Sequence, residues 1–314
     1  MIIDSHVHLI RPFNSLGHPQ VYARGPGVSA EDYINLMEAY GIDKAFFISW
    51  SPEDILSDLL MKNIDPYART LRETMNREYA LEVMEKYSNR FYWFPCHINP
   101  AVVNYLSLTR ENLEMGASGI KLAPSFWGEL PDSPRVLPLY DLVEEYGAHV
   151  ILDTSFWYLG KDRQEGWFIG KDKQVGHREA AKQVKDFRDY LSHLRPIIRS
   201  HREVNFQLAH AGARQFTVEH AREVGEFIRE YPNVYADLGA LVSTQFNTEI
   251  ECLVEAAGED RVMFGTDWPH TAQGEKMYSA IENIRNNDKL TARARRKILG
   301  ENASRFMQRR KKFY

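Results

Sequence analysis

The sequence predicts an α/β protein folded as a single (β/α)₈ TIM barrel that spans residues 1–314 as one domain. Short β-type runs recur along the chain, and segments with helical periodicity separate them. Strict alternation of strand and helix favours a parallel sheet, and eight such units in 314 residues match the size of a closed barrel. A doubly wound sheet would carry a glycine-rich phosphate turn after its first strand, and no such turn follows Ile2–His8.

Each expected strand is a short apolar or β-branched run bounded by turn residues. These runs are Met1–His8, Lys44–Trp50, Phe91–Ile98, Gly119–Pro124, His149–Thr154, Val204–His210, Val234–Gly239 and Val262–Asp267. The first helix is expected to begin after the cap Ser29 and to stop at Gly41. The other expected helices are Asn76–Tyr87, Asn104–Met115, Leu137–Tyr146, Thr217–Tyr231, Thr248–Ala257, Glu275–Arg285 and Thr291–Leu299.

Two connections are too long for plain barrel turns: Ser51–Met75 after the second strand and Ser155–Glu203 after the fifth. Loops of this length in a compact fold usually serve as lids or substrate walls. Both follow the carboxyl ends of strands, where a barrel enzyme carries its active site, so we expect them over the mouth of the barrel. The second is rich in aromatic residues and is expected to turn helical over Arg178–Leu194.

The charge balance points to a small-molecule partner. The 39 Lys and Arg nearly balance the 43 Asp and Glu, which leaves a net charge of −4 and no overall attraction to nucleic acid or anionic lipid. The chain has no apolar run long enough to span a membrane, and its first ten residues lack the pattern of a signal peptide. The two cysteines, Cys96 and Cys252, are too few for a disulfide framework, so a cytoplasmic location is expected.

Candidate metal ligands occur at the first expected strand. Alternation along a strand puts Asp4, His6 and His8 on one face, and two imidazoles at a strand end can reach one cation. Two ordinary histidines at a strand end would give the same short motif.

Later strands add polar residues at the same level. His210 ends the sixth expected strand and Asp267 ends the eighth, each after an apolar run that must be buried. Either residue alone could be hydrogen-bonded structure. Together with His6 and His8 they converge on one mouth, which favours a site.

Five sequence pieces then resemble the amidohydrolase superfamily, in the amidohydrolase-related group that includes aminocarboxymuconate-semialdehyde decarboxylase and related aromatic-acid decarboxylases. The pieces are D-x-H-x-H at Asp4–His8, G-I-K-L at Gly119–Leu122, L-A-H-A-G at Leu208–Gly212, F-G-T-D-W-P at Phe264–Pro269 and I-L-G-E-N-A at Ile298–Ala303. They run in family order over nearly the whole chain.

The resemblance implies one divalent metal ion, zinc or alternatively manganese, with His6, His8 and Asp267 as ligands. Neutral imidazoles and a carboxylate suit Zn²⁺ and leave a position open for water or substrate. His210 falls on a family histidine that acts as acid and base or as a further ligand, and we favour acid–base catalysis because imidazole titrates near neutral pH. Asp4 is expected to be structural.

The chain departs from the family on the fifth strand, where Asp153 aligns with a metal-binding histidine. A carboxylate can replace an imidazole, so Asp153 is a candidate fourth ligand. The alternative is a hydrogen-bonding strand-end residue in a site with weakened metal binding, as in lactonase relatives that work without metal.

Candidate substrate-binding residues surround these positions. Lys121 is expected to meet an anionic substrate group or a strand-end carboxylate, or to form an ion pair inside the barrel. The carboxylated, metal-bridging lysine of binuclear relatives is not expected here. Arg214 is a candidate carboxylate clamp or a surface arginine. His97, Trp50 and Trp157 are candidate pocket walls or packing residues.

These residues predict a metal-dependent hydrolase that attacks a small amide, ester or lactone with metal-activated water, with His210 or Asp267 taking the proton. One alternative is a metal-dependent decarboxylase of a small aromatic or unsaturated carboxylic acid. Another is a metal-free ligand-binding barrel or lactonase. The sequence does not determine the oligomeric state; relatives often form homodimers, which makes a homodimer one candidate assembly.

Overall fold

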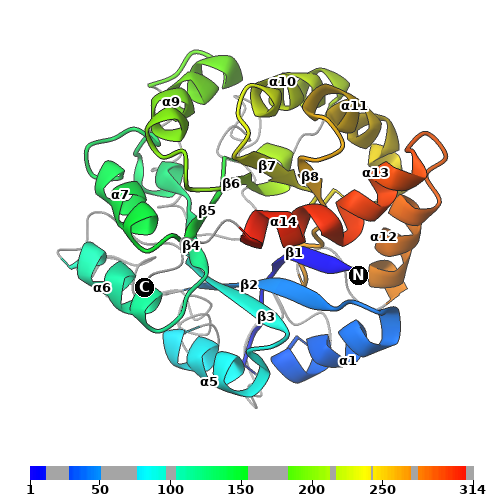
Figure 1. Ribbon diagram of the computed structural model, residues 1–314, viewed down its shortest axis with the longest axis horizontal. Coiled ribbons are helices and arrows are strands. Elements are labelled where there is room, and N and C mark those ends of the chain that lie inside the picture. Colours follow the sequence, from blue (N-terminus) through cyan, green and yellow to red (C-terminus); the bar gives the residue numbers. More distant parts are fainter. Residues whose placement is uncertain are drawn as a thin grey trace, which may run out of the picture.

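The computed structural model describes residues 1–11, 28–50, 76–96, 104–154, 183–212, 217–241, 243–269 and 275–308. Its eight parallel strands form one sheet in the order β1 to β8, so the predicted (β/α)₈ barrel is confirmed (Figure 1). The strands are β1 Ile3–Val7, β2 Lys44–Trp50, β3 Phe91–Cys96, β4 Gly119–Leu122, β5 His149–Leu152, β6 Phe206–Leu208, β7 Val234–Asp237 and β8 Val262–Met263.

The segment that follows the last strand pairs with the first strand and brings the sheet round on itself. The backbone N–H of Ser5 donates to the carbonyl of Phe264 at 2.9 Å, and that of His8 donates to Trp268 at 2.7 Å. A parallel bridge also joins Val7 and Trp268. The chain after β8 therefore runs beside β1, and side chains from both can reach one point.

The helices form a ring outside the strands (Figure 1). They are α1 Ala30–Tyr40, α5 Arg77–Tyr87, α6 Tyr105–Glu114, α7 Leu137–Glu145, α9 Phe187–Ser200, α10 Val218–Arg229, α11 Asn247–Ala257 and α12 Glu275–Arg285. Ser29 caps α1 by accepting from the N–H of Asp32, and Gly41 ends the helix in the left-handed conformation, as its side-chain-free backbone allows. None of the helices in the described ranges combines the length and apolarity needed to cross a bilayer.

Two expected helix boundaries are wrong. The helix expected over Arg178–Leu194 continues to Ser200, and α9 begins after the cap Asp186; residues 178–182 lie outside the described part of the chain. Pro196 lacks the N–H of a helix interior, but Ile197 and Ile198 bury their side chains and keep the helix going past it.

The C-terminal segment differs as well. Instead of one helix ending at Leu299, the chain forms α13 (Ala292–Arg296), a π-helical turn over Lys297–Glu301 and α14 (Asn302–Gln308). Gly300 lies in that turn, where a Cβ atom would sit 2.6 Å from the carbonyl oxygen of Met1. Only glycine lets this turn pack against the start of β1.

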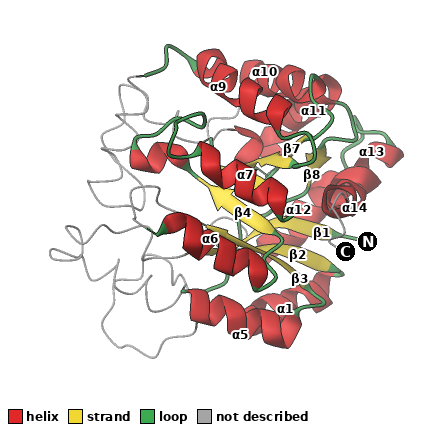
Figure 2. Ribbon diagram, turned by 60° about the vertical axis from the view of Figure 1, so that its left-hand side comes forward, coloured by secondary structure: helices red, strands yellow, loops and turns green. Residues whose placement is uncertain are grey.

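Helix α14 covers the amino ends of the strands (Figures 1 and 2). Its Phe306 ring lies 5.7 Å from Phe46, 5.4 Å from Tyr235 and 5.0 Å from His149, between ring centroids. Phe46, Tyr235 and Phe306 belong to a buried hydrophobic cluster inside the barrel, separate from the larger cluster between strands and helices. The interior is therefore filled by aromatic side chains at the amino ends of the strands.

Candidate active site

Strand β1 contains an irregularity that re-aims its side chains. Asp4 pairs with Ala45 and Val7 with Phe47, so β1 accommodates one extra residue between these two pairs. The expectation of one shared face holds for His6 and His8, which both approach Asp267, but is wrong for Asp4, whose carboxylate faces Tyr33 and Thr266.

Asp4 is instead held by hydrogen bonds beside helix α1. Its carboxylate accepts from Tyr33 at 2.8 Å and from the hydroxyl of Thr266 at 2.6 Å. Burial raises the pKa of Asp4 to about 7, although these hydrogen bonds act in the opposite direction. It joins β1 to α1 and to the segment after β8, which is a structural role.

The three expected metal ligands lie together and are buried. The Oδ1 atom of Asp267 is 3.7 Å from His6 Nε2 and 3.5 Å from His8 Nε2. A tetrahedral zinc ion with bonds of about 2.0–2.1 Å places its ligand atoms roughly 3.3–3.5 Å apart. The donor set fits a divalent metal ion with little rearrangement.

Hydrogen bonds fix the orientation of both imidazoles. His6 Nδ1 lies 3.0 Å from Asp237 Oδ2, and His8 Nδ1 lies 2.9 Å from the carbonyl oxygen of Ile48. A carboxylate and a carbonyl only accept, so each Nδ1 carries the proton and each Nε2 carries the lone pair on the side of Asp267. Metal-binding histidines are oriented in this way by their second nitrogen.

Asp267 follows β8 by four residues and has a left-handed backbone, with φ of 55°. Its N–H donates to the carbonyl of His6 at 2.8 Å, which fixes it beside β1. Left-handed backbone is uncommon outside glycine and costs energy, so it persists where neighbours enforce it, often at functional sites.

Asp237, at the end of β7, was not singled out from the sequence. Its Oδ2 accepts from His6 Nδ1 and from Gln207 Nε2 at 2.6 Å. Its Oδ1 accepts from the backbone N–H of His210 at 2.9 Å and of Gly239 at 2.8 Å. Burial raises the pKa of Asp237, while the His210 charge and these donors oppose the rise. One carboxylate thus links the metal-ligand candidate on β1 to the turn that carries His210.

His210 lies in the turn Ala209–Gly212 that follows β6, with left-handed backbone at His210 (φ 55°) and Ala211 (φ 50°). Its Nδ1 is 3.1 Å from the carbonyl oxygen of Gly239, so that nitrogen donates and Nε2 carries the lone pair. A Cβ on Gly239 would come within 3.0 Å of His210 Nδ1 and 2.8 Å of Asp237 Oδ1. The glycine is what allows this close approach.

The rings of His210 and His6 are 4.6 Å apart between centroids, so His210 lies next to the candidate ligands. His6, His210 and Asp237 form a second group whose potential ligand atoms lie within 4.8 Å of one another, besides the group of His6, His8 and Asp267. Asp237 already accepts a hydrogen bond from His6, so His6, His8 and Asp267 form the better metal site.

Lys121 and Asp153 lie at the same mouth. Lys121 Nζ is 3.1 Å from His6 Nε2 and 3.7 Å from Asp153 Oδ2, and Lys121 is only 3% exposed. Neither group of candidate ligand atoms among the described residues includes Asp153.

The other expected substrate-binding residues are not placed. His97, Trp157 and Arg214 lie outside the described residues, and for Trp50 only the backbone at the end of β2 is described.

His220 of α10 supports the His210 turn from outside. Its ring lies against that of Phe187, with the ring centroids 4.3 Å apart and the planes tilted by 43°, and it hydrogen-bonds with the backbone of Ala211. Burial lowers the pKa of His220 from 6.5 to about 4, so between these pH values the unfolded chain binds more protons and acid destabilises the fold.

We therefore expect His220→Phe, which keeps an aromatic ring against Phe187, to lose less unfolding free energy than the unaltered protein as the pH falls from 6.5 to 4. The difference from the unaltered protein should approach roughly 3 kcal/mol at the acid end. Denaturant melts at several pH values measure it, and parallel pH dependences for the two proteins would contradict it.

The comparison with family models decides the family. The amidohydrolase family model matches residues 3–308, almost the entire chain. The chain belongs to the amidohydrolase family. This amidohydrolase is accordingly an enzyme, and the family resemblance carried by the five motifs is confirmed. No curated protein sequence matches it significantly.

Solved structures resemble the amidohydrolase over its whole length. The 5-carboxyvanillate decarboxylase LigW from Sphingomonas paucimobilis has a TM-score of 0.64 at 13% identity, covering 98% of both chains. A zinc-bound amidohydrolase from Burkholderia multivorans has a TM-score of 0.61 at 15% identity, covering 98% of this chain and 99% of that one. The 2,6-dihydroxybenzoate decarboxylase from Rhizobium has a TM-score of 0.59 at 16% identity, covering 98% of both. At these identities the likeness is one of fold, shared by decarboxylases and amidohydrolases alike.

Proposed function

We propose that this amidohydrolase is a metal-dependent hydrolase of a small amide, ester or lactone. The observation that carries the proposal is the convergence of His6 Nε2, His8 Nε2 and Asp267 Oδ1, with His210 beside them. We infer one divalent ion, zinc or alternatively manganese, held by these three side chains. The zinc-bound Burkholderia multivorans amidohydrolase supports zinc. When bound, the ion supplies positive charge that polarises a carbonyl oxygen and makes water more acidic.

The acid–base work falls to His210. Its Nδ1–H is held by the Gly239 carbonyl, so Nε2 is the atom that takes a proton from the attacking water. The same atom then returns the proton to the leaving nitrogen or oxygen. Asp267, 7% exposed, is the second candidate proton acceptor.

Lys121 gives the mouth a positive charge on the substrate side, which favours a substrate bearing a carboxylate or an electron-rich carbonyl. We further propose that Arg214, His97, Trp50 and Trp157 complete the pocket. A cytoplasmic location and a homodimer belong to the same proposal, and Cys96 and Cys252 are both thiols rather than a disulfide.

A decarboxylase is the second candidate, favoured by the buried ammonium of Lys121 beside His6. A buried cation can hold the carboxylate of a substrate in a site closed to water. In that reaction His210 would donate a proton to the carbon that loses carbon dioxide.

The test is a screen of amides, esters, lactones and aromatic carboxylates with zinc-loaded and manganese-loaded enzyme in ¹⁸O-labelled water. A hydrolase incorporates one label into the acid product. Release of carbon dioxide from the substrate, with a hydrogen from solvent in its place in the product, would reject the hydrolase in favour of the decarboxylase. Turnover unaffected by complete removal of metal would reject both metal-dependent versions.

A further inference from the structure

The strongest unexplained contact in the site is between Lys121 and His6. Lys121 Nζ approaches the Nε2 atom of His6 to 3.1 Å. Because His6 Nδ1 is committed to Asp237, Nε2 carries the single lone pair of this ring. That lone pair can accept a hydrogen bond from the lysine or bind a metal ion, but not both at once.

We propose that Lys121 is the built-in cation of this site: its ammonium takes the metal position at His6 in the metal-free enzyme and must move toward Asp153 for the metal to bind. Lys121 thereby sets metal affinity, and Asp153 acts through Lys121 rather than as a ligand. The inference rests on the proposed metal-dependent function and concerns its regulation.

Charge explains why the lysine lies there. Asp153, Asp237 and Asp267 are all at most 7% exposed; Asp237 and Asp267 lie beside the imidazoles, and Asp153 lies beside Lys121. Buried carboxylates without a nearby cation are costly, and the Lys121 ammonium compensates them when no metal is bound. A divalent ion at His6 Nε2 would supply that compensation itself and would repel an ammonium a few ångströms away.

Asp153 is positioned to receive the displaced ammonium. It follows β5, which pairs with the strand that carries Lys121, and its N–H donates to the carbonyl of Leu122 at 2.7 Å. Asp153 Oδ2 is already 3.7 Å from Lys121 Nζ, so a small side-chain rotation suffices to complete the ion pair. The same residue lies outside both groups of candidate metal ligands among the described side chains.

The experiment measures metal affinity, not activity. Chelator-treated enzyme is titrated with Zn²⁺ and Co²⁺ by calorimetry, and the Co²⁺ absorption spectrum reports the ligand field. We expect Lys121→Met to bind either ion about tenfold to a hundredfold more tightly, the range that changes around metal ligands commonly produce. Lys121→Gln repeats the removal of charge with a polar chain, in case the methionine variant does not fold, and Lys121→Arg should bind as weakly as the unaltered enzyme.

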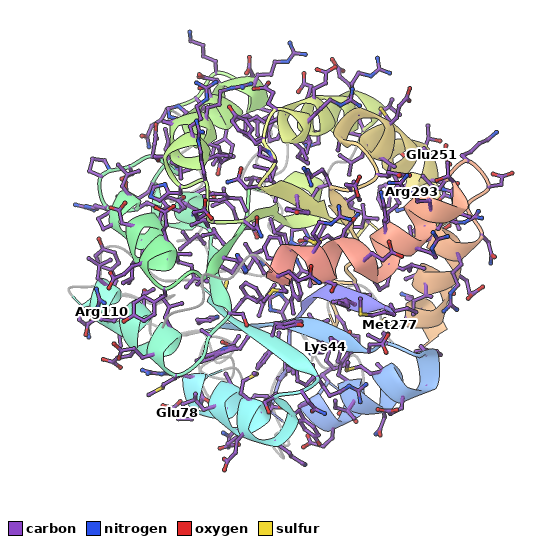
Figure 3. The ribbon with its side chains drawn as sticks, in the orientation of Figure 1. Lys44, Glu78, Arg110, Glu251, Met277 and Arg293 are labelled. Atoms are coloured by element: carbon purple, nitrogen blue, oxygen red, sulfur yellow. The ribbon has the colours of Figure 1, made fainter. Side chains whose placement is uncertain are left out.

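Lys44→Met is the matched control. Lys44 is a partly buried lysine at the amino end of β2, far from the candidate ligands, and its Nζ lies 3.4 Å from the hydroxyl of Tyr92 (Figure 3). Its removal changes the net charge by the same amount and should leave metal affinity unchanged.

A double-mutant cycle separates the two roles of Asp153. Asp153→Asn alone should weaken metal binding, because the displaced ammonium loses its partner. In the Lys121→Met background the same change should have no effect. If Asp153→Asn weakens binding equally in both backgrounds, Asp153 is a ligand and the proposal fails.

The remaining outcomes are equally distinct. Equal affinities of the unaltered enzyme and Lys121→Met would overturn the inference and leave the metal enzyme standing. Weaker binding by Lys121→Met, with one added CO₂ on Lys121 by mass spectrometry, would make the lysine a ligand and also overturn it. Metal binding by none of the folded proteins would reject the proposed function and the inference with it.

Discussion

Asp267→Asn is expected to abolish tight metal binding and to lower kcat/KM by about three orders of magnitude, since a metal ion supplies several kcal/mol to charge stabilisation. Asparagine tolerates the left-handed backbone at this position, and its N–H can still donate to His6, so the fold should persist. The neutral amide oxygen replaces the carboxylate that faces both imidazoles. Elemental analysis of the purified variant and kinetics with added zinc measure the two effects.

Asp141→Asn is the matched control for this change. Asp141 lies on α7 with its side chain 77% exposed and pairs with His201 outside the barrel. It should retain metal and activity. Full metal content in Asp267→Asn would show that Asp267 is not a ligand.

His210→Asn is expected to lower kcat by about 10²–10⁴-fold while metal content stays normal, which is the usual contribution of a positioned general base. Asparagine suits the left-handed turn, and its side-chain N–H can replace Nδ1 as donor to the Gly239 carbonyl. What is lost is Nε2, the atom assigned to proton transfer.

His193→Asn serves as the comparison, since His193 lies on α9 in the outer ring of helices and its Nδ1 lies 2.8 Å from Asp132 Oδ2. Loss of metal from His210→Asn would make His210 a ligand instead of a base. Unchanged kcat would remove it from the mechanism.

The order and number of strands were predictable because apolar runs and helix caps are local. The β2 bounds, the start of α1 after Ser29 and the bounds of α12 all follow from such signals. Strand ends were predicted too long: β8 ends at Met263 rather than at Asp267. Strand ends depend on pairing with neighbours, which the local pattern does not contain.

Helix α14 was not predicted for a similar reason. Residues 302–308 precede a basic tail that looks solvated, and only contacts with distant strands bury Phe306 in the barrel.

Within the site, the mouth location of His6, His8, His210 and Asp267 was predictable, since each lies near the end of a buried strand or shortly after it. Asp237 has the same signal, an acidic residue ending the run VYAD, and could have been found by it. The bulge in β1 and the four donors to Asp237 were not predictable, because both depend on the register between strands far apart in the sequence.

The position of helix α14 affects how substrate enters and product leaves the barrel. The Phe306 ring packs among Phe46, Tyr235 and His149 and fills the barrel at the amino ends of the strands. Because the described residues fill the amino end, we expect substrate and product to enter and leave at the carboxyl ends of the strands. Bound product would occupy the space that the next substrate needs, so product inhibition should be competitive. A chelator should reach the proposed metal ion by the same route as the substrate.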